Sequence, residues 1–224
     1  MRIGAVIQAR MGSTRLPGKV LMDLHGKPVL GHVLERAMAV TGIDTVMVAT
    51  TVHDRDNPIV EYCRRWQVPC YRGSEDDVLD RYYRASVLDR LQVVIRITAD
   101  CPLLDPRVVE RVLAEFVSSG ADYCSNVHPP TYPDGLDVEI MRIEALERAW
   151  CEAADPFERE HVTPYIWRRS ITTDEHGFIL HNVAADMDLS ALRWTVDTHA
   201  DLEQVRQLLV CSYDYRKLLW KGGE

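Results

Sequence analysis

Three cationic side chains follow closely on a short apolar run near the N-terminus. Residues 3–7 (IGAVI) have the composition of a buried strand, and the glycine-containing segment after them carries Arg10, Arg15 and Lys19. Glycines let the backbone come close to a ligand, free N–H groups can point at oxygen atoms, and cations neutralise negative charge. This combination predicts a polyphosphate-binding loop, with a cationic surface loop as the alternative. The spacing GxxxxGK[ST] of a Walker loop is absent from it.

Two aspartates stand directly after apolar runs further along the chain. Asp100 comes after residues 92–98 (QVVIRIT), and Asp197 follows residues 192–196 (LRWTV). Ligands of open α/β sheets bind beyond the carboxyl ends of the strands, and Mg²⁺ prefers carboxylate, phosphate and water oxygens. The alternatives are a turn-stabilising role for Asp100 and a helix-capping role for Asp197. Together, the two acids and the cationic loop predict Mg²⁺-assisted transfer at a nucleotide α-phosphate, in which the cations stabilise the leaving pyrophosphate.

The elements that must position these residues alternate between strands and helices. Apolar runs predict strands at residues 2–8, 45–50, 68–71 and 92–98, and apolar residues at helical spacing predict helices between them. The helices are expected to begin at Pro28, at Asn57, at the capping-box sequence SEDD (74–77) and at Asp105. Continuous apolar strands separated by helices indicate an α/β fold with a mostly parallel sheet covered on both faces.

The pattern changes after Tyr123. A proline-rich loop is expected at 126–134, strands at 136–141, 178–183 and 192–196, and helices at 144–153 and 157–169. A second capping-box sequence, from Thr198 to Asp201, predicts a last helix. We interpret residues 1–224 as a single domain in which residues 126–192 form an insertion that supplies acceptor contacts and a dimer surface.

The composition restricts the classes of function. The 224 residues hold 26 Lys+Arg against 34 Asp+Glu, a net charge of −8. This acidity argues against binding to nucleic acid or to a membrane surface. There is no apolar run of the roughly 20 residues that span a bilayer and no signal-peptide pattern. The six cysteines are scattered and form no CxxC pair. We expect a reduced, cytoplasmic protein without a zinc site or a disulfide framework.

The chain resembles a known family over nearly its whole length. The resemblance is carried by IQARMGSTRLPGK (7–19), YRGSEDDVLDRY (71–82), RITADCPL (96–103), YPDGLD (132–137), REHVTPY (159–165) and WTVDT (194–198). These motifs are similar to those of the cytidylyltransferases that activate acidic sugars, such as 3-deoxy-manno-octulosonate and acylneuraminate, and most similar to the spore-coat polysaccharide branch. The resemblance implies a Rossmann-like fold of the nucleotide-diphospho-sugar transferase type.

The resemblance also implies roles for particular residues. Arg10, Arg15 and Lys19 would hold the triphosphate of CTP, with Asp100 as a further catalytic residue. Asp100 and Asp197 match the positions that bind Mg²⁺ in the family. The full nucleotide-binding set implied is Ala9, Arg10, Gly12, Ser13, Lys19, Ala49, Thr50, Arg72, Gly73 and Ser74. The acceptor-binding set, matched to the spore-coat branch, is Tyr132, Asp134, Asp137, Arg159 and His161. The implied partners are CTP and a small acidic or phosphorylated acceptor, and the implied assembly is a homodimer.

Two features depart from the better-known members of that family. Their first metal-binding aspartate is followed by another acid, whereas Asp100 is followed by Cys101, which we interpret as a packed residue and not a reactive thiol. The acceptor region also differs from that of the sugar-acid enzymes, so the acceptor stays open, as does CTP against UTP. Two other functions compete with nucleotidyl transfer: a glycosyltransferase of related fold, and a catalytically silent nucleotide-binding module.

Overall fold

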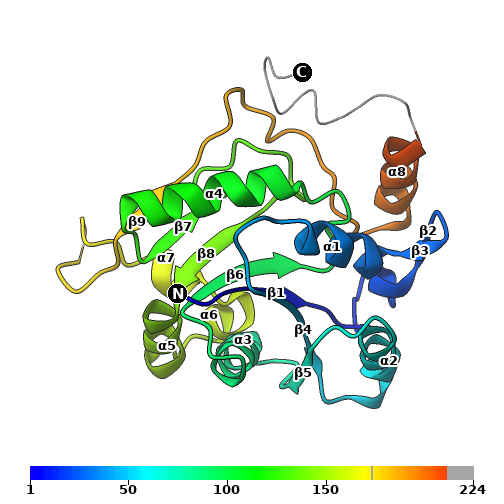
Figure 1. Ribbon diagram of the computed structural model, residues 1–224, viewed down its shortest axis with the longest axis horizontal. Helices are drawn as coiled ribbons and strands as arrows, with labels where there is room; N and C mark the ends of the chain where they lie inside the picture. Colours follow the sequence, from blue (N-terminus) through cyan, green and yellow to red (C-terminus); the bar gives the residue numbers. More distant parts are fainter. Residues whose placement is uncertain (173, 211–224) are drawn as a thin grey trace.

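The chain folds around one large sheet. The computed structural model describes residues 1–172 and 174–210, and within them seven strands pair in the order β5-β4-β1-β6-β8-β7-β9 (Figure 1). The strands are β1 (Ile3–Gln8), β4 (Thr45–Thr51), β5 (Cys70–Gly73), β6 (Val93–Thr98), β7 (Tyr123–Ser125), β8 (Glu139–Arg142) and β9 (Leu180–Asn182). Strands β5, β4, β1 and β6 are mutually parallel, β8 is antiparallel to both of its neighbours, and β9 is parallel to β7. The mostly parallel α/β sheet predicted from the sequence is confirmed.

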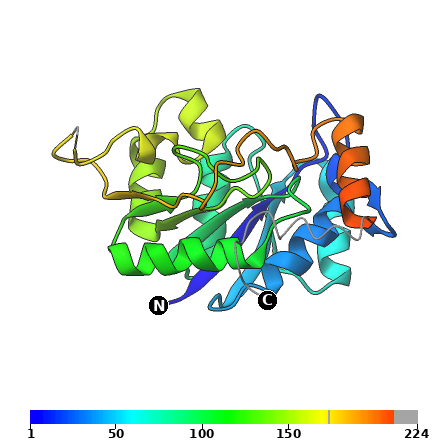
Figure 2. The same cartoon turned by 90° about the horizontal axis from the view of Figure 1, so that it is seen from above.

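Helices cover both faces of this sheet (Figure 2). Side chains of α1 (Val29–Met38), α2 (Asn57–Arg65), α4 (Pro106–Ser119) and α8 (His199–Val210) join the core on one face. Side chains of α3 (Val78–Leu88), α5 (Ile143–Glu152) and α7 (Pro164–Trp167) join the core on the other. Alternation along β1 shows the same division, since Ala5 and Ile7 face the first core and Val6 faces the second. The short α6 (Pro156–His161) packs beside α3.

Smaller elements complete the described chain. Strands β2 (Asp23–Leu24) and β3 (Lys27–Pro28) form a separate two-stranded ribbon, and 3₁₀ turns lie at Lys19–Leu21 and Asp54–Asp56. The segment 126–192, predicted as an insertion, contributes β8 and β9 to the central sheet. The helices found in the described residues are too short and too polar to cross a bilayer. Five cysteines are free thiols, and Cys211 lies outside the described residues.

Three local predictions were wrong. Residues 192–196 do not form a strand, because the N–H groups of Trp194 and Val196 donate to the loop carbonyls of Asp134 and Asp100, at 2.6 and 2.8 Å. The helix predicted at 157–169 is divided into α6 and α7, because Val162 has a φ of 73° and a proline follows two residues later.

The third correction concerns the start of α3. Its N-cap is Asp77, whose carboxylate accepts a hydrogen bond of 2.8 Å from the Asp80 N–H. The hydroxyl of Ser74 instead accepts from the Asp77 N–H, at 3.0 Å, and so stabilises the turn before the helix. Asp77 therefore takes the role that the sequence analysis gave to Ser74.

The capping box at the start of α8 is confirmed. The Thr198 hydroxyl accepts from the Asp201 N–H at 3.2 Å, and the Asp201 carboxylate accepts from the Thr198 N–H at 2.8 Å. Replacing Thr198 with alanine is expected to lower the free energy of unfolding by about 1 kcal/mol, because one helix N–H loses its partner. Urea unfolding followed by circular dichroism measures this change. Thr198→Ser keeps the hydroxyl and serves as the control, and an equal loss in both variants would contradict the capping role.

Candidate active site

The site lies where the chain leaves β1 and β6. These two strands are parallel neighbours whose last residues, Gln8 and Thr98, stand opposite each other. From β1 the chain proceeds to β4 and β5 on one side, and then returns to β6 on the other side. Neighbouring loops diverge at such a point, which leaves a crevice beyond the carboxyl ends of the strands. The loop with the three cations and the loop with Asp100 therefore begin side by side.

The loop after β1 is held in place by its own backbone and by one buried acid. The N–H groups of Ser13 and Gly18 both donate to the Met11 carbonyl, at 2.9 Å each. The Met11 N–H donates to the carboxylate of Asp56, which is fully buried, at 2.7 Å. Leu16 anchors the loop in the core. Gly18 has a φ of 74°, a conformation that favours glycine, and it leads the chain into the turn that carries Lys19.

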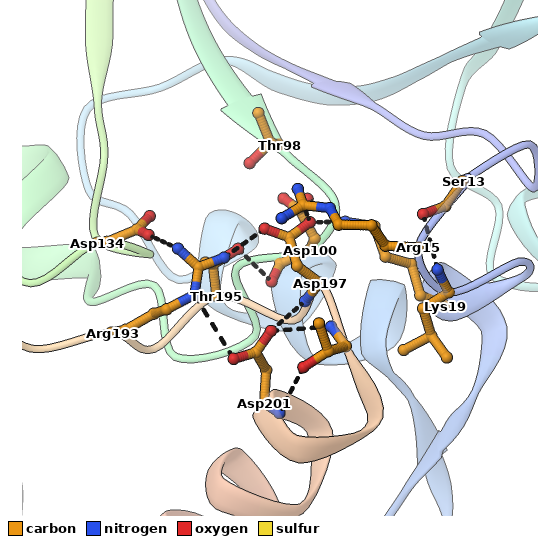
Figure 3. A network of polar contacts seen from close by, with 12 residues as sticks. Ser13, Arg15, Lys19, Thr98, Asp100, Asp134, Arg193, Thr195, Asp197 and Asp201 are labelled. Carbon is orange, nitrogen blue, oxygen red and sulfur yellow. Dashed lines mark hydrogen bonds and ion pairs between the residues drawn. The ribbon is translucent and has the colours of Figure 1, made fainter.

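A cluster of opposite charges occupies the crevice (Figure 3). The Lys19 ammonium lies between two carboxylates, 2.6 Å from Asp100 and 2.8 Å from Asp197. Arg15 approaches Asp197 as well, at 2.8 Å. The Asp100 carbonyl accepts the Val196 N–H at 2.8 Å, which fastens the segment before Asp197 to the loop after β6. Asp100 and Asp197, almost a hundred positions apart, are thus brought together as predicted, although only Asp100 follows a strand.

The electrostatics of the cluster keep its members charged. Burial by itself lowers the pKa of Lys19, but the adjacent Asp100 and Asp197 raise it above its ordinary value. Burial by itself raises the pKa of Asp197, but Lys19, Arg15 and Arg193 hold it below the usual range of an aspartate. Arg193 contacts Asp134, Asp197 and Asp201, so the acids here share several cations (Figure 3).

A cavity of about 320 Å³ opens over this cluster. All three predicted loop cations and both predicted metal ligands line it, together with Ala9 and Ser13. Glu160 and His161, the last two residues of the predicted acceptor segment REH, also line it. The structure thus brings the polyphosphate half of the predicted site into one cavity and places one acceptor candidate, His161, at its edge.

The other predicted nucleotide residues do not line this cavity. Ala49 and Thr50 are buried within β4. Arg72 extends toward the β4 end, where it donates to the carbonyls of Thr51 and His53, both at 2.9 Å. The two residues after Arg72, Gly73 and Ser74, also stand apart from the cavity lining. Gly12 lies beneath the Arg55–Glu75 ion pair, because a Cβ at this position would come within 2.9 Å of both side chains.

The cavity is also lined by two arginines that the sequence analysis did not select as site residues. Arg81 of α3 is buried and donates to the Ser74 carbonyl at 2.7 Å, and burial lowers its pKa. Arg96 of β6 forms an ion pair with Glu139 of β8, the residue opposite it in the antiparallel register. An arginine inside the otherwise apolar run VVIRIT was the signal for Arg96. Arg81 gave no comparable signal, because the DVLDRYYR segment around it alternates charged and apolar residues as any amphipathic helix does.

The predicted acceptor residues separate into different surroundings. Tyr132 belongs to the apolar core and lies away from the cavity. Asp134 is paired with Arg193 at the rim of the charged cluster. Arg159 forms an ion pair with Asp77 and donates to the Trp150 carbonyl at 2.6 Å. Asp137 and His161 line a second cavity next to the first. The sequence analysis placed these five residues in one group, whereas in the structure only Asp137 and His161 line the same cavity.

Cys101 and the acids around it bear on metal binding. The Cys101 thiol is buried 3.1 Å from the Thr98 hydroxyl, and burial raises its pKa well above the ordinary value, so it is a packed thiol and not a thiolate. The described residues contain no group of three or more histidines, cysteines and acids that could enclose a metal. Two carboxylates that already accommodate a cation between them fit Mg²⁺, which takes its remaining ligands from phosphate and water.

Comparison with known proteins places the chain in a family. A family model described as cytidylyltransferase matches residues 5–221. The chain is a cytidylyltransferase family member. Among curated proteins, it is 30% identical over 213 residues to the spore coat polysaccharide biosynthesis protein SpsF of Bacillus subtilis, covering 91% of this chain and 84% of that protein. It is 35% identical over 230 residues to the 3-deoxy-manno-octulosonate cytidylyltransferase of Erwinia tasmaniensis, covering 95% and 88%.

The fold of this cytidylyltransferase agrees with that of a solved relative. A cytidylyltransferase from Leptospira borgpetersenii superposes with a TM-score of 0.86 at 30% identity, covering 96% of this chain and 90% of that one. The family resemblance and the Rossmann-like fold predicted from the motifs are therefore confirmed, and the chain is a nucleotidyltransferase.

Proposed function

We propose that this cytidylyltransferase uses CTP and Mg²⁺ to transfer a cytidylyl group to an acidic sugar or a phosphorylated acceptor, with release of pyrophosphate. The product would enter the synthesis of a surface polysaccharide or glycoconjugate, as the names of its relatives suggest. One observation carries the proposal: Lys19, Arg15, Asp100 and Asp197 converge in a single cavity at the carboxyl ends of β1 and β6.

The protein's own residues have distinct tasks in this reaction. Arg10, Arg15 and Lys19 would hold the triphosphate and stabilise the charge that develops on the leaving pyrophosphate. An acceptor oxygen forms a bond to the α-phosphorus while the bond from that phosphorus to the bridging oxygen breaks, and the acceptor proton passes to solvent or to a nearby base. Asp100 and Asp197 would hold Mg²⁺, which when bound neutralises charge on the phosphate oxygens.

Burial strengthens the interactions of Lys19 in particular. The Lys19 side chain is only 10% exposed, so its charge acts in surroundings of low dielectric constant. The ion pairs with Asp100 and Asp197 fix the ammonium at one place before substrate arrives. A pre-positioned charge lowers the reaction barrier without reorganisation during the step.

A screen for pyrophosphate release tests the proposal. Four nucleoside triphosphates are combined with sugar acids, sugar phosphates and phosphonates, each with and without Mg²⁺. We expect acceptor-dependent pyrophosphate release with CTP that EDTA abolishes. Release of a nucleoside diphosphate or monophosphate from a nucleotide sugar would instead support a glycosyltransferase. CTP binding that is independent of metal, without turnover on any acceptor, would support a silent module.

Two further predictions from the resemblance stay predictions. A homodimer would appear as a particle of twice the mass of the 25.6 kDa chain in sedimentation at micromolar concentration. A single species of monomer mass would contradict it. The cytoplasmic location is likewise a prediction, which cell fractionation tests.

A further inference from the structure

The carboxylates of Asp100 and Asp197 are paired with cations of the chain itself. The Lys19 ammonium lies 2.6 Å from Oδ2 of Asp100 and 2.8 Å from Oδ1 of Asp197. Arg15 also contacts Oδ1 of Asp197, at 2.8 Å, and Arg193 contacts Oδ2 of the same carboxylate (Figure 3). Both oxygens of Asp197 and one oxygen of Asp100 therefore have cationic partners within the protein.

Lys19 lies at the position that a shared metal ion would need. A Mg²⁺ ion held by both carboxylates must approach an oxygen of each to about 2.1 Å, and the ammonium nitrogen is hydrogen-bonded to one oxygen of each. Two cations so close together repel each other strongly where water is scarce, and the Lys19 side chain is only 10% exposed. The ammonium and a divalent cation therefore compete for the same pair of oxygens.

The two acids form only part of a metal site. In residues 1–172 and 174–210, no group of three or more histidines, cysteines and acids could enclose a metal. Mg²⁺ takes about six oxygen ligands in an octahedral arrangement, so most of them would come from phosphate and water. A triphosphate in this cavity would add both oxygen ligands and negative charge. Its binding would therefore shift the competition in favour of the metal.

The lysine itself connects nucleotide binding to metal binding. Its main chain is fixed in the loop after β1, where the Met22 N–H donates to the Lys19 carbonyl at 3.1 Å. The flexible stem of lysine lets the ammonium turn between neighbouring partners. Arg10 and Arg15 line the same cavity and would draw a triphosphate to it. The ammonium can then exchange a carboxylate oxygen for a phosphate oxygen, which leaves the carboxylate to the metal.

We propose that Lys19 blocks the metal position until a triphosphate enters the cavity, so that Asp100 and Asp197 take a divalent cation only together with the nucleotide. This inference rests on the proposed function, and it gives Lys19 a second task besides holding the triphosphate. As a cation, the ammonium opposes the metal and attracts the phosphates. Its removal shifts the two affinities in opposite directions, which the loss of a merely structural side chain would not do.

Metal binding to the whole protein without nucleotide tests this inference. The probe is Mn²⁺, whose free form is measured by electron paramagnetic resonance. Lys19→Met is expected to bind Mn²⁺ at least about tenfold more tightly than the original protein, a change within the usual range of coupling between binding sites. The gain should disappear in Lys19→Met/Asp197→Asn, which lacks one of the two acids. Lys27→Met is the matched control, because Lys27 pairs with the exposed Glu35 and lines neither cavity.

Calorimetry with CTP in EDTA supplies the second readout. Lys19→Met should bind the metal-free nucleotide at least about tenfold more weakly, because a charge-assisted hydrogen bond to phosphate is lost. Lys27→Met should match the original protein in both measurements. Circular dichroism spectra show whether each variant retains the fold.

Several results would overturn the inference: no gain of Mn²⁺ affinity in Lys19→Met, a gain that persists in the double variant, an equal gain in Lys27→Met, or unchanged CTP binding by Lys19→Met. If Lys19→Met does not fold, Asp100→Asn and Asp197→Asn decide. Each should change the Mn²⁺ affinity of the nucleotide-free protein less than about twofold, and a loss of about tenfold in either would show that the acids bind metal beside Lys19. The proposed function fails separately, if no acceptor gives pyrophosphate from CTP and Mg²⁺.

Discussion

Replacing Asp100 with alanine is expected to lower the turnover number for pyrophosphate release at least about a hundredfold, because charge stabilisation at a developing oxyanion is worth several kcal/mol. Asp100 is one of the two carboxylates proposed to hold Mg²⁺. Without it, Asp197 would be the single carboxylate left to bind the metal. Steady-state pyrophosphate release with CTP and an acceptor found in the screen measures the effect.

The fold should survive this substitution. The Asp100 carboxylate contacts the Lys19 ammonium, which retains Asp197 at 2.8 Å in the variant. The hydrogen bond that holds the segment before Asp197 is accepted by the Asp100 main-chain carbonyl from the Val196 N–H. A change of the Asp100 side chain leaves this bond in place. We therefore expect an unchanged circular dichroism spectrum and a change in unfolding free energy of about 1 kcal/mol or less, as for other partly exposed ion pairs.

A matched substitution separates the metal role from a general loss of acidity. Asp188→Ala removes an exposed carboxylate outside both cavities, and it should leave turnover within twofold, a range of about 0.4 kcal/mol. Raising the Mg²⁺ concentration should restore part of the activity of Asp100→Ala if the loss is one of metal affinity. Turnover of Asp100→Ala within about threefold of the original protein, roughly 0.7 kcal/mol, would contradict the assignment.

The sequence predicted the charged half of the site because it depends on a general property of sheets. Residues at the carboxyl ends of parallel strands must meet at one edge, so a loop after β1 and an acid after β6 are neighbours in any such fold. In this protein, the last residues of the two strands, Gln8 and Thr98, are paired in the sheet register. Asp197 reached the same place without a strand of its own, because Asp100 and Asp134 supply the carbonyls that receive its segment's N–H groups.

The other half of the site depends on packing that no local pattern encodes. Arg72 looked like a nucleotide contact, yet two main-chain carbonyls and the Asn57 side chain bind its guanidinium group. Arg81 looked like an ordinary helical cation, yet the packing of α3 on the sheet turns it into the cavity. Tyr132, which stands in a polar motif, is drawn into the core. In each case the tertiary partner decides where a side chain points, and that partner is distant in sequence.

The ion pair between Arg96 and Glu139 could not be predicted from the sequence either, because the two residues meet only through the antiparallel register of β6 and β8. The Glu139 carboxylate is buried, and it accepts hydrogen bonds from the Tyr123 hydroxyl at 2.5 Å and the Thr163 hydroxyl at 2.6 Å, besides its ion pair with Arg96. One acid thus joins β6, β7, β8 and the start of α7. Burial by itself raises the pKa of Glu139, but Arg96 and the hydroxyls hold it below the usual range.

Replacing Glu139 with glutamine is expected to lower the free energy of unfolding by about 3–5 kcal/mol, because it leaves the Arg96 charge buried without its partner. The double variant Arg96→Met/Glu139→Gln should recover part of that loss, since it also removes the uncompensated charge. Glu203→Gln on α8 is the control. It alters an exposed pair with Arg206, and such pairs contribute about 0–1 kcal/mol. Urea unfolding at pH 7 measures all three variants.

The pH dependence of that loss identifies its cause. Because the folded-state pKa of Glu139 is depressed, its charge contributes stability that is full above the usual glutamate pKa of about 4.3 and is lost as the pH falls through the folded-state value. The difference in stability between the original protein and Glu139→Gln should therefore be constant near neutral pH and should narrow in acid. A difference that stays constant into acid would show that the hydrogen bonds or the packing of Glu139, and not its charge opposite Arg96, stabilise this part of the sheet.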